Sequence, residues 1–430
     1  MKYKAIRGME DILPEDIGNW QWIEKTAREI LESYGYAEIR TPILEDASIF
    51  TRSIGEETDI VTKEMYAFKD KKERKLALRP EGTAPIVRAY VEHSLDNMPF
   101  GNKLYYIGPM FRSERPQKGR QRQFHQIGVE AFGSNSPHAD AEVIMQLDNM
   151  LKSLGLRNYT IDLNSLGCRK DKIKFADELK SYLKDKQNRL CDDCKVRVKK
   201  NILRVLDCKK DVCIQVLKNA PNVLSSLCDS CKNSYEKLKA CLSSLGIDFK
   251  EKKNLVRGLD YYTGTVFEIT HASLGSQDAI GAGGRYDDLV KDFGGIDTGA
   301  VGYALGMERI IIALGKKEIS VKKVLYLATL GDKAKVEGFR IAGKIRSAIP
   351  HLTVMTDIKE ASLKSQLRFA DKSGAKFVLI LGDNEISKGI VILRDMSSQK
   401  QIEVSIEGVI EELRKYVPKD EGRRTRDGKD

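Results

Sequence analysis

Apolar residues near the start of the chain recur at the spacing of one helix face. Steps of three and four residues connect Ile17, Trp20, Ile23, Ala27, Ile30, Leu31 and Tyr34. Such steps place side chains on a single side of a helix. Gly35 follows at a position where helices often end. The pattern predicts an amphipathic helix over residues 17–34.

Strand-like segments dominate the next part of the chain. β-branched and aromatic residues between turn signals predict strands at residues 36–43, 64–78, 104–107, 123–132, 159–163, 266–270 and 279–281. Turn or loop chemistry surrounds Gly55 and the basic run at 69–75. The strands follow one another without a helix after each one. This succession favours an antiparallel α+β core over a doubly wound parallel sheet.

Three regions differ from this core. Residues 167–246 are rich in Lys, Leu and Cys and largely helical in pattern. Within residues 322–417, strands are predicted at 324–328, 352–355, 377–381, 389–393 and 401–404. Helices are predicted there at 334–348, 362–373 and 406–416. The charged tail is predicted to be disordered. The expected domains are 1–166 and 247–320 as two parts of one core, 167–246 as a helical insertion, 322–417 as an α/β domain and 418–430 as a basic tail.

Composition limits the class of protein. The chain has 430 residues, of which 41% are hydrophobic and 31% charged, and this profile is typical of soluble globular proteins with several domains. No apolar run approaches the roughly 20 residues that a membrane span needs. The basic start lacks the apolar stretch of a signal peptide. We therefore expect a cytoplasmic protein without a membrane span.

The charge balance indicates the kind of partner. Lys and Arg exceed Asp and Glu, which gives a net charge of +11. A basic excess favours a polyanionic partner, because binding to phosphates releases counterions. Many basic proteins bind no nucleic acid, so the charge alone makes nucleic acid a hypothesis and no more.

Seven of the eight cysteines lie within residues 191–241. Two Cys-x-x-Cys pairs stand out, Cys191 with Cys194 and Cys228 with Cys231, and four thiolates arranged in this way suit tetrahedral zinc. Against this hypothesis, the pairs are far apart, and Cys208, Cys213 and Cys241 compete as ligands. Buried reduced thiols are the alternative, and structural disulfides are disfavoured in the cytoplasm.

Common catalytic motifs are absent from the sequence. The chain contains no Gly-x-x-x-x-Gly-Lys-[Ser/Thr], no Gly-x-Gly-x-x-Gly after a strand, no His-Glu-x-x-His and no Gly-x-Ser-x-Gly. The five histidines are too scattered to indicate a metal cluster. The sequence therefore lacks the usual signatures of P-loop, Rossmann, zincin and α/β-hydrolase sites.

The most informative segment is the basic loop and strand at residues 111–130. The loop concentrates five cations, Arg112, Arg115, Lys118, Arg120 and Arg122. Arginine and lysine at this density can hold a polyphosphate through charge-assisted hydrogen bonds. Phe124, Gln126 and Glu130 share one face of the following strand, and this face is more typical of a polar pocket wall than of a solvated hairpin.

Three later segments carry further candidate chemistry. Residues 255–268 bring Arg257, Asp260, Tyr261 and Tyr262 together at a turn that Gly258 permits. Residues 281–287 are rich in glycine, which lets backbone approach a ligand closely. Residues 302–309 are predicted to be a strand that turns at Gly306 into a helix, with Arg309 in its first turn, directed toward an anion.

At these residues the chain resembles class II aminoacyl-tRNA synthetases, and in particular the bacterial histidyl-tRNA synthetase family. Arg79-Pro-Glu-Gly-Thr83 resembles the amino-acid-binding loop, and residues 111–124 and 302–309 resemble motifs 2 and 3. Residues 255–268 and 282–287 resemble the two histidine-specific segments. The likeness extends from Arg7-Gly-Met-Glu-Asp-Ile-Leu-Pro14 to about Tyr416, and Arg257-Gly-Leu-Asp-Tyr-Tyr262 is its most specific part.

The resemblance implies a fold and an activity. The fold is α+β: an antiparallel-sheet catalytic core of class II type, a mainly helical insertion and a C-terminal α/β anticodon-binding domain. The implied reaction activates histidine with ATP to histidyl-adenylate and transfers the histidyl group to the 3′ end of histidine tRNA. Magnesium would accompany ATP, and the family forms homodimers. A zinc ion in the cysteine-rich insertion does not follow from the resemblance.

The resemblance also assigns roles to individual residues. The catalytic set would be Arg257, Arg112 and Gln126. The histidine-binding set would be Glu81, Gly82, Thr83, Arg112, Gln126, Glu130, Arg257, Tyr261 and Tyr262. The ATP-binding set would be Arg112, Glu114, Arg120, Phe124 and Arg309. Arg257 would take a role that a metal ion has in related enzymes. A carboxylate and a phenol would satisfy the two imidazole nitrogens.

Two other functions compete with this one. A non-catalytic relative, the regulatory subunit of a phosphoribosyltransferase in histidine biosynthesis, is expected to lack the C-terminal domain and the cations of motif 2, and both are intact here. A zinc-dependent RNA-binding module would explain the four cysteines but not the arginines of the motifs. The absence of any nucleophile-plus-base motif agrees with adenylate chemistry, which needs charge stabilisation and alignment.

Overall fold

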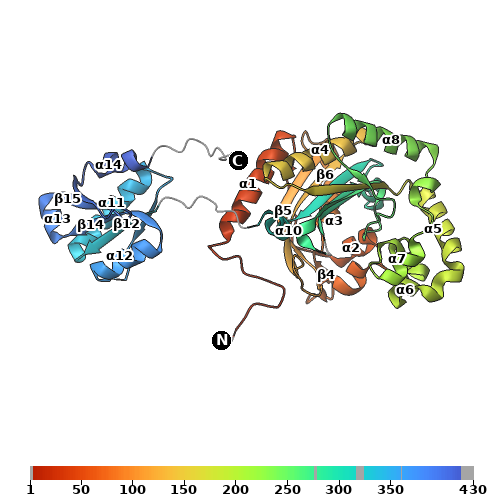
Figure 1. Ribbon diagram of the computed structural model, residues 1–430, viewed down its shortest axis with the longest axis horizontal. Helices are drawn as coiled ribbons and strands as arrows, with labels where there is room; N and C mark the ends of the chain where they lie inside the picture. The colour runs from red at the N-terminus through yellow and green to blue at the C-terminus, as the bar shows by residue number, and fades with distance from the viewer. Residues whose placement is uncertain (1–2, 276–277, 316–323, 360, 418–430) are drawn as a thin grey trace. The chain divides into compact units, whose positions relative to one another are not determined.

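The chain forms two compact units, residues 1–317 and 318–430, shown in a computed structural model (Figure 1). The structure describes residues 3–275, 278–315, 324–359 and 361–417. The expected tail at 418–430 and the expected domain boundary at 320–322 lie outside the described residues. The insertion belongs to the first unit, together with both parts of the core.

An eight-stranded sheet forms the centre of the first unit, in the order β1-β5-β6-β11-β10-β9-β7-β8. Only the edge pairs β1 with β5 and β7 with β8 are parallel. The prediction of an antiparallel α+β core is therefore confirmed. The strands are β1 Ala37–Glu38, β5 Lys103–Phe111, β6 Gln123–Phe132, β7 Tyr159–Ser165, β8 Lys250–Glu251, β9 Thr263–His271, β10 Ala279–Arg285 and β11 Ala300–Gly306.

Helices cover one face of this sheet, as Figure 1 shows for α1, α4 and α8. These helices span Ile17–Ser33, Pro137–Ser153 and Asp229–Ser244. Their apolar faces share one buried cluster with Ile127 and Val129 of β6. The predicted helix at 17–34 is confirmed. Helix α4 was not predicted, although Ser136 caps its first turn and Pro137 occupies its first position.

Two predicted strands are shorter than the segments assigned to them. Residues 64–78 form a hairpin of β3 Ala67–Lys69 and β4 Lys75–Leu78. The basic run between them turns because the Asp70 carboxylate accepts hydrogen bonds from the backbone N–H groups of Lys72 and Arg74. Within 36–43 only β1 is extended. The nearby elements are β2 Leu44–Asp46, α2 Ala47–Ile54, a π-helical turn Ile60–Glu64 and α3 Thr83–Glu92.

The insertion is helical, as predicted, and has a small core of its own. Its elements are α5 Arg169–Leu183, α6 Asp192–Lys200, α7 Asp211–Leu217 and α8, with 3-10 segments η3 Lys184–Arg189, η4 Ile202–Asp207 and η5 Val223–Ser226 between them. Phe175, Leu179 and Val205 are buried together with Cys194 and Cys213. This core shares no buried residue with the clusters that pack against the central sheet, although the partly buried Leu206 contacts both it and one of them.

The second unit is an α/β domain with a five-stranded sheet in the order β13-β12-β14-β15-β16. Its strands are β12 Val324–Leu330, β13 Thr353–Thr356, β14 Ala375–Gly382, β15 Ile390–Asp395 and β16 Gln401–Ser405. Its helices are α11 Asp332–Ala348, α12 Leu363–Lys372, α13 Asp383–Lys388 and α14 Val409–Tyr416. All the predicted elements are present, and α13 is additional. In neither unit do the described residues include a helix that is long and apolar enough to cross a membrane.

Candidate active site

A cavity of about 460 Å³ opens in the first unit beside β6, β9, β10 and β11, and this volume is typical of small-molecule sites. The alternation of residues along strand β6 explains why the cavity lies on this face of the sheet. Ile127 and Val129 point into the helix-covered core, whereas Phe124 and Gln126 line the cavity. Alternate residues of a strand face opposite sides. The predicted pocket wall is therefore present at Phe124 and Gln126, whereas Glu130, the third residue predicted on this face, does not line the cavity.

The basic loop between β5 and β6 forms one wall. The Arg112 Nε donates to the Pro80 carbonyl at 2.9 Å, and the Arg112 guanidinium lies 5.3 Å from the ring centroid of Phe124. Arg120 Nη1 lies 3.0 Å from Glu114 Oε2. All four side chains line the cavity, so the loop offers cations and an aromatic face to the same space.

A third arginine lies at the end of the cavity where β11 meets α10, Met307–Leu314. Arg309 Nε donates to the Gly119 carbonyl at 2.9 Å, and Nη1 donates to the Ala279 carbonyl. Burial, and then the nearby Arg120, lower the pKa of Arg309. A half-buried guanidinium beside another cation favours an anionic ligand. The predicted turn at Gly306 and the placement of Arg309 in the first turn of the helix are confirmed.

Arg257 enters the cavity from the turn before β9. Its Nη1 donates to Glu268 Oε1 at 2.8 Å, and Glu268 keeps the pKa of Arg257 above its usual value, against the opposing effect of burial. Among the described residues, Arg257 Nε and Gln126 Oε1 are buried without a hydrogen-bond partner. Buried polar atoms without partners are rare in native proteins. Both residues line the cavity, so a ligand there would satisfy them.

The opposite wall combines a carboxylate with two phenols. Both oxygens of Glu81 accept hydrogen bonds from backbone at the start of α3, from Thr83 N at 2.7 Å and Ala84 N at 2.8 Å. Burial raises the pKa of Glu81. The Tyr261 hydroxyl lies 3.5 Å from Glu81 Oε2, and the rings of Tyr261 and Tyr262 are 4.7 Å apart. Both phenols line the cavity.

Two of the expected site residues are not among the residues that line the cavity. Gly82 packs against Tyr106, since a Cβ at Gly82 would lie 2.2 Å from that ring. Glu130 is buried behind the wall, where its carboxylate accepts hydrogen bonds from Thr83 Oγ1 at 2.7 Å and from the Tyr286 hydroxyl. The other expected residues line one cavity, and they come from four segments of the chain, at 81–83, 112–126, 257–262 and 309.

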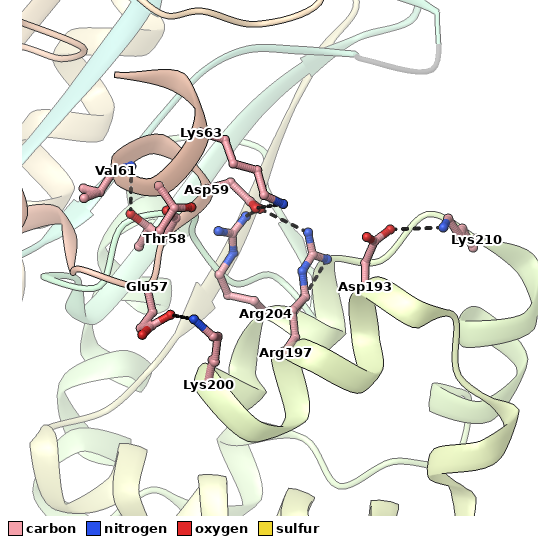
Figure 2. Close-up of polar contacts among 11 residues, drawn as sticks. Glu57, Thr58, Asp59, Val61, Lys63, Asp193, Arg197, Lys200, Arg204 and Lys210 are labelled. Carbon is pink, nitrogen blue, oxygen red and sulfur yellow. Dashed lines mark hydrogen bonds and ion pairs between the residues drawn. The ribbon is translucent and has the colours of Figure 1, made fainter. Parts of the chain in front are cut away.

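Several wall residues were not predicted. Glu268 belongs to the segment that contains Arg257, but the sequence did not show that the two side chains pair. The insertion supplies Arg197, Arg204 and others to the cavity. Figure 2 shows both arginines directed at Asp59, with Nη2 to Oδ2 distances of 3.3 and 3.2 Å. No local sequence pattern predicts the contact of these arginines with Asp59, because the partners are more than 130 residues apart in the chain.

Replacing Glu130 by Gln is expected to change how stability depends on pH. Burial raises the pKa of Glu130 to about 8, well above the value of about 4.3 in an unfolded chain. The folded protein therefore retains a proton that the unfolded chain loses, and the free energy of unfolding falls as pH rises between these values. Gln cannot ionise, so Glu130→Gln should gain stability relative to the parent as pH rises.

Thermal unfolding of both proteins at about pH 5.5 and about pH 8.5 checks this result. The melting temperature of the parent should fall relative to that of the variant at the higher pH. A difference that stays constant across this range would show that Glu130 has the same charge in both states.

Known proteins resemble this chain over nearly its whole length. The family model described as histidyl-tRNA synthetase matches residues 8–310, and the one described as anticodon binding domain matches residues 310–416. A histidine–tRNA ligase of Thermosipho melanesiensis is 49% identical over 96% of this chain and 99% of its own length. That of Thermotoga maritima is 49% identical over 98% of this chain and all of its own length.

Solved structures agree with these matches. The apo histidyl-tRNA synthetase of S. aureus superimposes with a TM-score of 0.79 at 34% identity, covering 95% of this chain and 99% of that one. The histidyl-tRNA synthetase of Nostoc sp. shares the fold, with a TM-score of 0.67 at 22% identity over 97% of this chain and all of that one. With its cavity built from the segments that resemble the motifs, the chain belongs to the histidyl-tRNA synthetase family.

Proposed function

We propose that this chain ligates histidine to histidine tRNA, by first activating histidine with ATP and then transferring the histidyl group to the 3′ end of the tRNA. The observation that carries the proposal is the convergence of Arg112, Arg257 and Arg309 on one cavity. The histidine carboxylate and the triphosphate are both anions, and these cations lower the cost of bringing them together. Family membership supports the choice of amino acid.

In the first step a carboxylate oxygen of histidine bonds to the α-phosphorus of ATP, and the bond from that phosphorus to the bridging oxygen of pyrophosphate breaks. The protein contributes alignment and charge stabilisation. Arg112 and Arg257 would hold the α-phosphate and the carboxylate, and Gln126 would orient the substrate. Arg257 Nε and Gln126 Oε1 are buried without hydrogen-bond partners, and the bound substrates would supply those partners.

ATP would lie along the arginine-lined side of the cavity. Phe124 would stack on the adenine, and Glu114 would accept from its amino group. Arg120 and Arg309 would hold the γ-phosphate end. Magnesium takes oxygen ligands and usually arrives with nucleotide phosphates. Glu64 lines the cavity beside Glu114, and burial, then the nearby Glu114, raise the pKa of Glu64. The Glu64 carboxylate fits a magnesium ion, which would neutralise charge on the phosphates.

Histidine would occupy the side lined by Glu81, Thr83, Tyr261 and Tyr262. Glu81 and Thr83 would bind the amino group, while Gly82 shapes the loop between them. The imidazole has one donor and one acceptor nitrogen. We assign one of them to Tyr262, with Tyr261 beside it. Glu130 lies behind the wall, so its part in histidine binding would be to orient the Thr83 hydroxyl, which donates to Glu130 Oε1 at 2.7 Å. A site built in this way rejects analogues that leave its polar groups unpaired.

Replacing Tyr262 by Phe is expected to lower kcat/KM for histidine by about tenfold, because one hydrogen bond in a buried site is worth roughly 1–2 kcal/mol. The KM for ATP should stay the same, since the proposal places Tyr262 against histidine and not against ATP. Pyrophosphate exchange at varied histidine and varied ATP measures both values. An unchanged kcat/KM for histidine would remove the phenol from the recognition set.

The second unit would bind the anticodon stem of the tRNA, as the match to an anticodon binding domain supports. We propose a homodimer formed through the catalytic unit and a cytoplasmic location. In that unit β2, β4 and β3 form a three-stranded sheet, which exposes Leu44 and Phe68, with Ile43 exposed just before β2. A purely regulatory role is disfavoured, because the cations at the cavity and the second unit are both present.

Charging of bulk tRNA tests the proposed overall reaction. With ATP and labelled histidine, the purified protein should transfer label to acid-precipitable tRNA, and the label should disappear after mild alkaline hydrolysis of the ester. Each of the other amino acids serves as a control. Transfer of another amino acid, or none with histidine, would reject the proposal.

A further inference from the structure

The cysteines of the insertion do not group as the sequence suggested. The structure does not bring the hypothetical set of Cys191, Cys194, Cys228 and Cys231 together, because the two Cys-x-x-Cys pairs begin different helices, α6 and α8, and belong to different groups. Instead the structure forms two groups: one of Cys191, Cys194, Cys208 and Cys213, and one of Cys168, Asp171, Cys228 and Cys231. In each group the ligand atoms lie within 4.8 Å of one another.

The four sulfurs of the first group have the spacing of a tetrahedral metal site. Zinc–sulfur bonds of about 2.3 Å place the sulfurs of a tetrahedron about 3.8 Å apart. The Cys191 and Cys208 sulfurs are 3.9 Å apart, far longer than the roughly 2.05 Å of a disulfide. An iron–sulfur cubane holds its cysteine sulfurs further apart than one ion does, so this spacing favours a single ion.

Three elements bring these sulfurs together. Cys191 caps α6 and Cys194 lies in its first turn, Cys208 follows η4, and Cys213 belongs to α7. Cys194 and Cys213 are fully buried. The backbone N–H of Cys191 donates to the Cys213 sulfur at 3.3 Å, and N–H donors of this kind support metal thiolates. The surrounding helices are short, and small cores of this kind commonly depend on a bound metal.

The second group has an explanation without a metal. The Asp171 carboxylate accepts from the backbone N–H of Cys168 at 3.2 Å and from that of Cys228 at 3.0 Å. It therefore caps α5 and α8, and both of its oxygens are already used. Cys228 is exposed. This group provides a matched control, because it has the same Cys-x-x-Cys spacing at a helix start.

We propose that Cys191, Cys194, Cys208 and Cys213 bind one zinc ion as a structural tetrathiolate site, and that the ion holds the cavity wall that the insertion supplies. The segment between the second and third ligands carries Arg197 and Arg204, which reach Asp59 of the catalytic core. Figure 2 shows this segment against the core, with Lys200 paired to Glu57. The metal site and the active-site wall thus share one short stretch of chain.

Metal analysis of the full-length protein tests the site, whether or not the proposed reaction is correct. Protein produced with zinc supplementation should contain about one zinc per chain. Cys213→Ser should lose the zinc, whereas Cys228→Ser should retain it. Zinc-free protein reconstituted with cobalt should show the visible bands of a tetrahedral ion and strong thiolate charge-transfer absorption, a measurement that needs no variant.

Proteolysis tests the second half of the proposal. Removing zinc with a chelator should expose the segment at 192–209 to trypsin, and adding zinc back should restore protection. A parent protein without zinc or cobalt binding, a Cys191–Cys208 disulfide found by mass spectrometry, or zinc lost from Cys228→Ser but kept in Cys213→Ser would overturn the site. Equal cleavage with and without zinc would overturn its role in holding the wall.

Discussion

Replacing Arg257 by Ala is expected to lower the rate of histidyl-adenylate formation by about 10²- to 10³-fold, which corresponds to about 3 to 4 kcal/mol of transition-state stabilisation. The Arg257 side chain is 19% exposed, and its Nε is buried without a partner among the described residues. In the proposed complex it faces the carboxylate and the α-phosphate as negative charge develops. Rapid-quench measurement of adenylate at saturating substrates gives the rate directly.

The experiment must distinguish a loss of catalysis from a loss of folding stability, because Arg257 also pairs with Glu268. Removing Arg257 leaves Glu268 with Lys252, whose Nζ is 3.6 Å from its carboxylate. The control is Glu268→Gln, which breaks the same ion pair but keeps the arginine. Arg257→Ala should lose activity far beyond this control at a similar melting temperature. Equal adenylation rates in the two variants would show that the ion pair, not the cation, matters.

Replacing Arg309 by Ala is expected to lower kcat/KM for ATP by about 100-fold, since a buried charge-assisted contact to phosphate contributes roughly 2–3 kcal/mol. Two carbonyls hold this guanidinium, those of Gly119 and Ala279, so its position is set before ATP binds. The KM for histidine should remain within about twofold of the parent. Exchange of pyrophosphate at varied ATP measures the effect.

The matched control for Arg309→Ala is Lys118→Ala. Lys118 is an exposed cation of the same basic loop and does not line the cavity. If both substitutions weaken ATP binding equally, general positive charge attracts the nucleotide. A much larger effect at Arg309 would locate the phosphate at the start of α10.

Local sequence patterns predicted the parts of the site that follow from strand and helix periodicity. Strand alternation placed Phe124 and Gln126 on one face, and the glycine turn before α10 placed Arg309 in the first helical turn. Each of these inferences needs only a few neighbouring residues. The antiparallel character of the sheet followed in the same way, from strands that succeed one another without crossover helices.

Other features depend on contacts between distant segments. The capping signals of α4 at Ser136 and Pro137 are present in the sequence, but its packing against α1 and α8 is not a local property. The pairing of Arg197 with Asp59 joins the insertion to the core across 138 residues. Spacing alone also misgrouped the cysteines, because chain distance does not show which helix starts meet in space.

The most direct test of the central claim is the exchange of labelled pyrophosphate into ATP. This assay isolates adenylation in the arginine-lined cavity and requires no tRNA. Exchange should occur with histidine, stop when histidine is omitted, and remain at background with each of the other amino acids. Exchange that proceeds without histidine, or faster with a different amino acid, would contradict the assignment of this cavity to histidine activation.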